Sequence, residues 1–184
     1  MIRIMSNELR DLFLNLSPRR QLVRRGTTVF CRGDRVTSVF MVDDGAVLLQ
    51  RAQESGTVIT LQRAEAGDVL AEASVYAKTY HCDAVVSDDA RLLVVRRRHF
   101  LTQLTSNTLL AELWATHLAK TIQSARAQVD ILSRGTVAAR LDGWMAWKDR
   151  GLPPKGEWKS LAEDIGVTPE ALYREIARRR RSSA

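Results

Sequence analysis

The chain has 184 residues, 27% of them charged and 45% hydrophobic, a composition that favours a folded protein and argues against a disordered one. The formal net charge is +7 and the isoelectric point is near 10.0, so an anionic partner such as nucleic acid is favoured. No apolar run approaches the roughly 20 residues of a membrane span, and the N-terminus lacks the apolar core of a signal peptide, which together predict a soluble, cytoplasmic protein.

The first part of the chain changes from a helical pattern to a strand pattern. Residues 1–18 predict a short amphipathic helix, whose apolar side carries Leu9, Leu12, Phe13 and Leu16. From residue 21 to residue 98, short apolar runs alternate with glycine and aspartate turn signals. The predicted strands are residues 21–24, 28–31, 37–42, 46–51, 57–62, 69–71, 80–86 and 90–95. Many short strands separated by such turns favour an antiparallel roll or jelly roll over a parallel sheet.

A long helix is predicted over residues 107–132. Its apolar residues recur every three or four positions and form one stripe, consisting of Leu110, Trp114, Leu118, Ile122, Ala125, Val129 and Leu132. The stripe could pack on the preceding strands, or it could pair with the same stripe of a second copy in a short coiled coil. Residues 133–135 then break the helix and are the expected hinge between two functional parts.

The C-terminal part predicts a helix over residues 136–149 and then two short helices joined by a tight turn. The first of the two spans residues 158–165 and has an apolar inward face. Gly166 supplies a left-handed residue, Thr168 an N-cap and Pro169 the first position of the second helix. This spacing is typical of a helix-turn-helix, whose second helix enters the DNA major groove. An ordinary pair of antiparallel helices would also fit it.

Positive charge is denser towards the C-terminus. From Arg134 onward there are eleven basic and seven acidic residues, and four consecutive arginines stand at residues 178–181. Phosphate neutralisation requires such charge, which strengthens the DNA-binding reading. A basic tail on a protein that does not bind DNA is the competing interpretation.

Four segments follow one another in a recognisable order: VFCRGD, VFMVDDGAVLL, ITLQRAEAGDVLAEASVYAKTYHCDAVV and RLLVVRRRHF. Together with the helices behind them, they resemble the cyclic-nucleotide-binding-type β-roll of the CRP/FNR family of bacterial transcription regulators. The resemblance implies an α+β fold: an antiparallel β-roll (jelly roll), a long dimerisation helix and a small all-α helix-turn-helix domain whose wing is reduced or absent. It places the sensor β-roll at residues 1–106, the dimerisation helix at 107–133 and the DNA-binding domain at 134–184.

The resemblance also implies an effector pocket, whose residues would be Ala71, Glu72, Ala73, Ser74, Cys82 and Asp83. Glu72 could accept a hydrogen bond from a ribose hydroxyl. Nucleotide-binding members carry an arginine and a small hydroxyl residue where this chain has Cys82 and Asp83, so the cationic contact that a phosphate requires is missing. Cyclic AMP is therefore disfavoured as the effector, and no cofactor is identified. Alternation along the strand points Cys82 inward, which favours a core role over a redox role.

For the recognition helix, the family pattern implies a hydroxyl residue, Arg, Glu and a further Arg four residues after that Glu. Thr168, Glu170 and Arg174 match this pattern, whereas Pro169 replaces the first Arg, so the operator should differ from the usual one. The predicted DNA-binding residues are Lys159, Thr168, Pro169, Glu170, Tyr173, Arg174, Arg178 and Arg179. Of these, Glu170, Tyr173 and Arg174 are expected at base edges, and Lys159, Thr168, Arg178 and Arg179 at phosphates. The chain ends soon after residue 181, so we expect the arginine run to act as a phosphate clamp in place of a wing.

The sequence carries no G-x-S-x-G, phosphate-binding loop or H-E-x-x-H motif, and its three histidines are scattered. We therefore predict no enzyme, no catalytic residues and no metal site. The predicted function is a homodimeric regulator that binds double-stranded operator DNA, with RNA polymerase as a further candidate partner. The alternative is a ligand-responsive interaction module whose C-terminal helices bind a protein.

Overall fold

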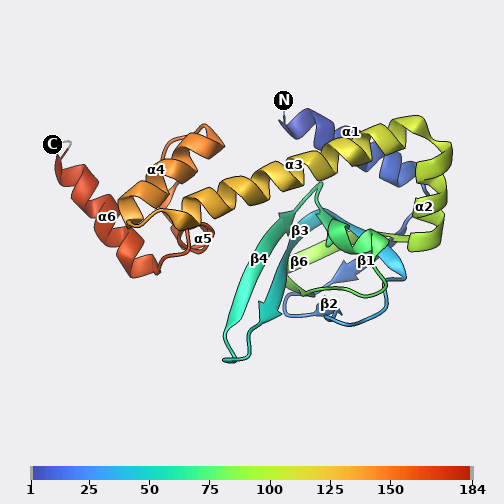
Figure 1. The fold of residues 1–184 in the computed structure, drawn as a ribbon, viewed down its shortest axis with the longest axis horizontal. Helices are drawn as coiled ribbons and strands as arrows, with labels where there is room; N and C mark the ends of the chain where they lie inside the picture. The colour runs from blue at the N-terminus through green and yellow to red at the C-terminus, as the bar shows by residue number, and fades with distance from the viewer. Residues whose placement is uncertain (1, 183–184) are drawn as a thin grey trace. The chain divides into compact units, whose positions relative to one another are not determined.

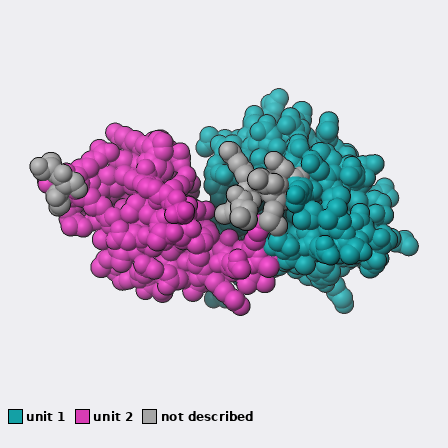
Figure 2. All heavy atoms as spheres, turned by 90° about the horizontal axis from the view of Figure 1, so that it is seen from above, with its two compact units in different colours: residues 1–118 teal, residues 119–184 magenta. Residues whose placement is uncertain are grey.

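The computed structural model describes residues 2–182, and the chain divides after Leu118 into two compact units, which Figure 2 colours separately. The boundary lies within the long helix α3 (Thr108–Ser133), so each unit contains one part of that helix. None of the helices described is long and apolar enough to cross a membrane.

The first unit is an antiparallel β-roll, as predicted (Figure 1). The sheet is ordered β1-β6-β3-β4, while β2 pairs with β6 and β5 pairs with β3. The strands are β1 (Arg19–Val23), β2 (Thr28–Phe30), β3 (Ser38–Ala52), β4 (Val58–Glu65), β5 (Val69–Leu70) and β6 (Asp83–Arg96). Two long strands, β3 and β6, pair with each other along most of their length and hold the shorter strands.

The prediction of eight short strands was wrong at two places, because β3 and β6 each continue through a turn signal. The β3–β6 register shifts between Val42 and Val47, so the extra residues form bulges and not a reversal. Gly45 has a φ of +83°, and a Cβ at this position would lie 2.2 Å from the carbonyl oxygen of Asp89. The glycine is therefore required for close strand approach inside a continuous strand.

Helices close one side of the roll and form a second core with it. Helix α1 (Ile2–Asn15) contributes Leu9 and Phe13, and the start of α3 contributes Leu110 and Trp114. Helix α2 (Arg97–Ser106), which was not predicted, leads from β6 into α3 (Figure 1), and its Phe100 ring lies 5.9 Å from that of Phe13 and 5.0 Å from that of Trp114. Its sequence is mostly polar, and Phe100 is its one buried residue. The sequence pattern therefore shows little of the periodicity by which a helix is predicted.

The second unit packs the end of α3 with three further helices, α4 (Val137–Lys148), α5 (Trp158–Asp164) and α6 (Pro169–Ser182), and the short turn η2 (Lys155–Glu157). Its buried core consists of Ile131, Leu141, Trp144, Trp158, Leu161, Ala162, Ile165, Leu172 and Ile176. The predicted inward face of α5 is thus confirmed, and Leu172 and Ile176 form the buried face of α6. Trp147 on α4 is 37% exposed.

The predicted apolar stripe of α3 has two different environments. Leu110 and Trp114 are buried in the core of the first unit, whereas Ile122 and Val129 are 53% and 67% exposed. Part of the stripe therefore packs on the roll, and the middle of the helix presents apolar side chains that the described residues leave uncovered.

Candidate functional site

The turn between α5 and α6 has the geometry that the sequence predicted. Gly166 adopts a φ of +63°, and the Thr168 hydroxyl accepts a hydrogen bond of 3.2 Å from the backbone N–H of Ala171. Leu172 and Ile176 are buried, which fixes the rotation of α6 about its axis. The opposite face of α6 is consequently turned outward.

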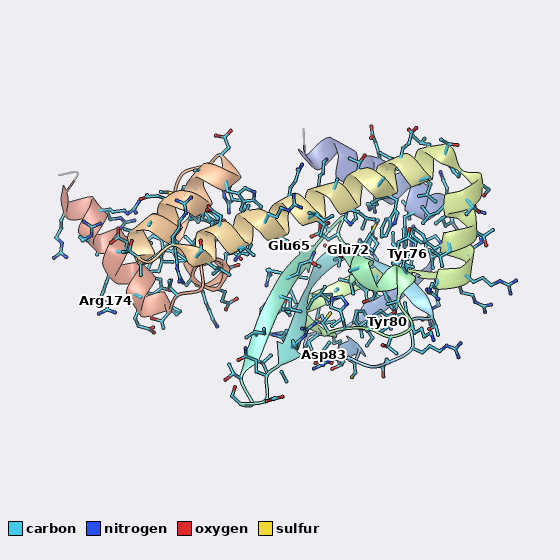
Figure 3. The ribbon with its side chains drawn as sticks, viewed as in Figure 1. Glu65, Glu72, Tyr76, Tyr80, Asp83 and Arg174 are labelled. Carbon is cyan, nitrogen blue, oxygen red and sulfur yellow. The ribbon has the colours of Figure 1, made fainter. Side chains whose placement is uncertain are left out.

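Two predicted base-contacting residues lie on that outward face. Arg174 projects from α6 (Figure 3) and, within the part of the chain that is described, forms no ion pair or hydrogen bond. Tyr173 is 42% exposed, and its ring centroid lies 5.6 Å from that of Trp158. Tyr173 is thus partly exposed while its ring packs against Trp158.

The remaining residues of the predicted recognition surface lie on α5 and at the start of α6. Lys159, Thr168 and Glu170 are exposed, and Pro169 is half-buried at the first position of α6. Glu170 lies in the first turn, where the helix dipole stabilises a carboxylate.

The predicted phosphate-binding arginines are engaged within the second unit. Arg178 donates from Nε and Nη2 to the Glu175 carboxylate, each at 2.8 Å. Arg179 donates to Glu175 at 2.7 Å and to Asp142 on α4 at 2.6 Å. Hydrogen bonds from Arg178, together with those from Arg179, lower the pKa of Glu175 to about 2. DNA phosphates would therefore have to share or replace these contacts.

The predicted effector segment begins with a strained residue. Ala71 adopts a left-handed conformation, with φ of 48°, which costs an alanine about 1–2 kcal/mol. It leads directly into the turn η1 (Glu72–Tyr76), on which Glu72 is buried (Figure 3). Burial raises the pKa of the Glu72 carboxyl, and the nearby Asp68 adds to that shift.

Cys82, which immediately precedes β6, lies inward as predicted. Cys82 and Ala84 are fully buried, while His81 is exposed and its Nδ1 lies 2.6 Å from the Ser74 hydroxyl. Burial raises the pKa of the Cys82 thiol, which disfavours the reactive thiolate. In the described part of the chain, no cluster of three His, Cys, Asp or Glu side chains is placed to hold a metal ion.

Sequence reasoning missed one cation in this region, Arg51 on β3. Its Nη2 donates a hydrogen bond of 2.9 Å to the carbonyl oxygen of His81. Val47 and Leu49 are buried in the core of the roll, and Arg51 follows them at the same two-residue step. That alternation was the signal by which the sequence could have placed Arg51 on the core side of the strand.

Comparison with known proteins agrees with this architecture. Residues 20–107 match the cyclic nucleotide-binding domain family. The chain is 30% identical over 124 residues to the cyclic AMP receptor protein of Thermus thermophilus, a match that covers 67% of this chain and 57% of the relative. The chain belongs to the CRP/FNR family.

Solved structures of the CRP/FNR family share the fold across most of their length. FixK2 from Bradyrhizobium japonicum superposes with a TM-score of 0.73 at 17% identity, covering 90% of this chain and 86% of the other. CLP from Xanthomonas campestris, described as a c-di-GMP responsive global regulator, gives a TM-score of 0.67 at 16% identity, covering 93% and 92%. The likeness therefore extends over both the β-roll and the C-terminal helices.

Proposed function

We propose that the chain is a sequence-specific DNA-binding transcription regulator that acts as a homodimer. The observation that carries this proposal is the orientation of α6, whose buried Leu172 and Ile176 turn Tyr173 and Arg174 outward. In a helix-turn-helix, such a face is the one that enters the major groove, where arginine binds guanine through two hydrogen bonds.

Dimerisation is proposed to use the uncovered part of α3. Leu118, Ile122, Ala125 and Val129 follow one another at alternating steps of four and three residues, which is the repeat of a coiled-coil seam. The exposure of Ile122 and Val129 supports this assignment. Two recognition helices related by two-fold symmetry would then read two half-sites at a fixed spacing.

The β-roll is proposed to sense a signal through the segment around Glu72 and Cys82. The position of residue 82 argues against cyclic AMP as that signal, because a buried cysteine offers a phosphate no charge. The predicted phosphate contacts of Lys159, Thr168, Arg178 and Arg179 complete the proposed interface, and they would set its salt dependence.

The test is selection of the purified full chain on a randomised duplex library at two salt concentrations, followed by sequencing. The proposal expects an enriched inverted repeat, with half-site centres about 10 base pairs apart or a multiple of that spacing. Salt-sensitive binding without enrichment would contradict sequence-specific recognition. Absence of binding even at low salt would favour a module whose C-terminal helices bind a protein.

A further inference from the structure

A concentration of positive charge lies in the first unit, at an open cleft with a volume of about 880 Å³. The cleft is formed where the chain enters β3 and where it passes from β6 into α2. Four of its ten lining residues are arginines, namely Arg35, Arg96, Arg97 and Arg98, and four others carry hydroxyl groups. Among the residues that the structure describes, no carboxylate lines it. The cleft is therefore suited to an anion.

Backbone pairing brings the arginines of the two segments together. Ser38 is paired with Arg96 at the end of the β3–β6 ladder, and the backbone N–H of Arg97 donates a hydrogen bond of 2.9 Å to the carbonyl oxygen of Thr37. Arg35 stands two residues before Thr37 and lines the same cleft. The main chain, and not an attraction between side chains, thus holds these like charges at one place.

The four charges are not compensated within the described part of the chain. The side chains of Arg35, Arg96 and Arg98 are exposed and form no ion pair or hydrogen bond with any residue described. Arg97 donates from Nε to the carbonyl oxygen of Val75 at 2.6 Å, which fixes the guanidinium without neutralising it. The first turn of α2 contains no acidic residue. Repulsion among the arginines therefore opposes folding, and a bound anion would relieve it.

The carboxylate nearest in sequence does not serve these arginines. Asp34 precedes Arg35 directly, yet it does not line the cleft. Its Oδ2 accepts a hydrogen bond of 2.9 Å from the backbone N–H of Cys31. Asp34 thus stabilises the turn before the cleft and leaves the guanidinium groups available to a ligand.

The number of arginines indicates the kind of anion. A guanidinium can bind a phosphate through two parallel hydrogen bonds, and a phosphate monoester offers three acceptor oxygens. Two guanidinium groups are therefore enough for one phosphate, and four match two or more phosphates. The hydroxyl groups of the lining can donate to further oxygens. A volume of about 880 Å³ lies within the range of small-molecule sites, which is about 300–1,000 Å³.

We propose that this cleft binds a small polyphosphate, meaning a molecule with two or more linked phosphate groups, through Arg35, Arg96, Arg97 and Arg98. The site goes beyond the proposed function, because none of its lining residues belongs to the effector segment or to the DNA-binding surface. A small ligand is favoured over an extended polyanion because the arginines converge on one cleft, whereas an extended polyanion is bound along a stripe of positive charge.

The test is calorimetric titration of the full chain with inorganic tripolyphosphate, in the absence of DNA and divalent cations and at about 0.15 M salt. Pyrophosphate and orthophosphate serve as shorter probes. We expect saturable binding of one tripolyphosphate per chain at submillimolar concentration, weaker binding of pyrophosphate and still weaker binding of orthophosphate. The double variant Arg35→Gln with Arg98→Gln should lose about tenfold or more in affinity for tripolyphosphate. Both side chains are exposed and form no hydrogen bond with a described residue, so their replacement should leave the fold intact.

Two control variants distinguish the cleft from positive charge in general. Arg24→Gln removes an exposed arginine of the first unit that does not line the cleft. Arg174→Ala removes an exposed arginine of the second unit. Each should leave the affinity for tripolyphosphate within about twofold of the wild-type value, because charges more than a Debye length of about 8 Å from the ligand are largely screened at this salt concentration.

The proposal is overturned if the wild-type chain does not bind tripolyphosphate saturably, or if the double variant binds it as tightly as the wild type. It is also overturned if either control variant loses as much affinity as the double variant, or if orthophosphate binds as tightly as tripolyphosphate. None of these results depends on DNA. Failure here alongside an enriched operator would leave the regulator function standing, whereas probe binding without DNA selectivity would contradict the regulator function and not this site.

Discussion

Arg179 on α6 donates a hydrogen bond from Nη1 to the carboxylate of Asp142 on α4, across 2.6 Å. The same guanidinium donates from Nη2 to the carbonyl oxygen of Ala138 at 3.0 Å, so α6 is fastened to α4 at two points. Arg178, its neighbour in sequence, instead bonds Glu175 on its own helix. The sequence analysis assigned both arginines to DNA phosphates. In the structure, Arg179 links α6 to α4, whereas the hydrogen bonds of Arg178 to Glu175 lie within α6.

This difference predicts different effects on stability. Arg179→Gln should lower the free energy of unfolding by about 1 kcal/mol, because it removes an ion pair and a backbone hydrogen bond between two helices. Arg178→Gln should lower it by less, since the exposed guanidinium of Arg178 makes its two bonds to Glu175 within the same helix. Urea unfolding monitored by circular dichroism measures both. Equal losses in the two variants would show that the contacts to α4 do not matter.

The Glu175 carboxylate, which both arginines contact, predicts an acid-dependent contribution to stability. Its pKa of about 2 lies below the ordinary value of 4.5, chiefly because Arg178 donates hydrogen bonds to it. The stabilisation is therefore present above pH 4.5 and is lost as the pH falls from about 4.5 to about 2.

The midpoint of thermal unfolding for the wild type and for Glu175→Gln tests this. The wild type should unfold at a higher temperature at pH 6, and the two curves should converge near pH 2. A difference that stays constant across that range would mean that the glutamate acts through packing and not through its charge.

The sequence predictions were accurate where a structural feature depends on residues that are neighbours in sequence, and they failed where it depends on residues that are distant in sequence. The turn around Gly166 was predicted residue by residue, because a left-handed glycine followed by an N-cap depends on neighbouring residues alone. The continuation of β3 through Gly45 was not predicted, because bulges and turns use the same residue types. At Gly45 the two differ only in the close approach of the backbone at Asp89, which is distant in sequence. Arg51 was missed for a similar reason, since its hydrogen-bond acceptor, the carbonyl oxygen of His81, lies thirty positions further along the chain.

Arg174 is predicted to contribute specificity more than overall affinity. Arg174→Ala should weaken binding to the selected operator by about 1–3 kcal/mol and relax the preference at one base pair of each half-site. Binding to random duplex DNA should change little, because that depends on phosphate contacts. Fluorescence anisotropy on the two DNAs at one salt concentration measures both. A uniform loss on both DNAs would place Arg174 at a phosphate instead.

The proposed dimer seam predicts a change in oligomeric state. Ile122→Glu combined with Val129→Glu would place two charges from each copy in an apolar seam, which should convert a dimer to a monomer at micromolar concentration. Gln123→Glu adds charge to the same stretch of α3, at an exposed position outside the stripe, and serves as the control. Sedimentation velocity reports the outcome. A doubly substituted chain that remains dimeric would rule out this seam.

Glu72 is predicted to be unfavourable for stability at neutral pH. Burial raises the pKa of its carboxyl above the ordinary value of 4.5, so the folded state holds the proton more tightly than the unfolded state. A shift of this sign contributes stability that is present below the unfolded pKa and is lost as the pH rises through the folded pKa. Above that window, folding buries a charge that has an unpartnered oxygen.

Glu72→Gln removes the charge with little change in volume, so it should raise the free energy of unfolding at pH 7. The advantage should shrink as the pH falls through the raised folded-state pKa towards 4.5, below which the wild-type carboxyl is protonated in both states. Denaturant titrations at several pH values check this, with Glu54→Gln, an exposed glutamate of the same unit, as the control. Equal or lower stability of Glu72→Gln at pH 7 would instead mean that a partner already satisfies the carboxylate in solution.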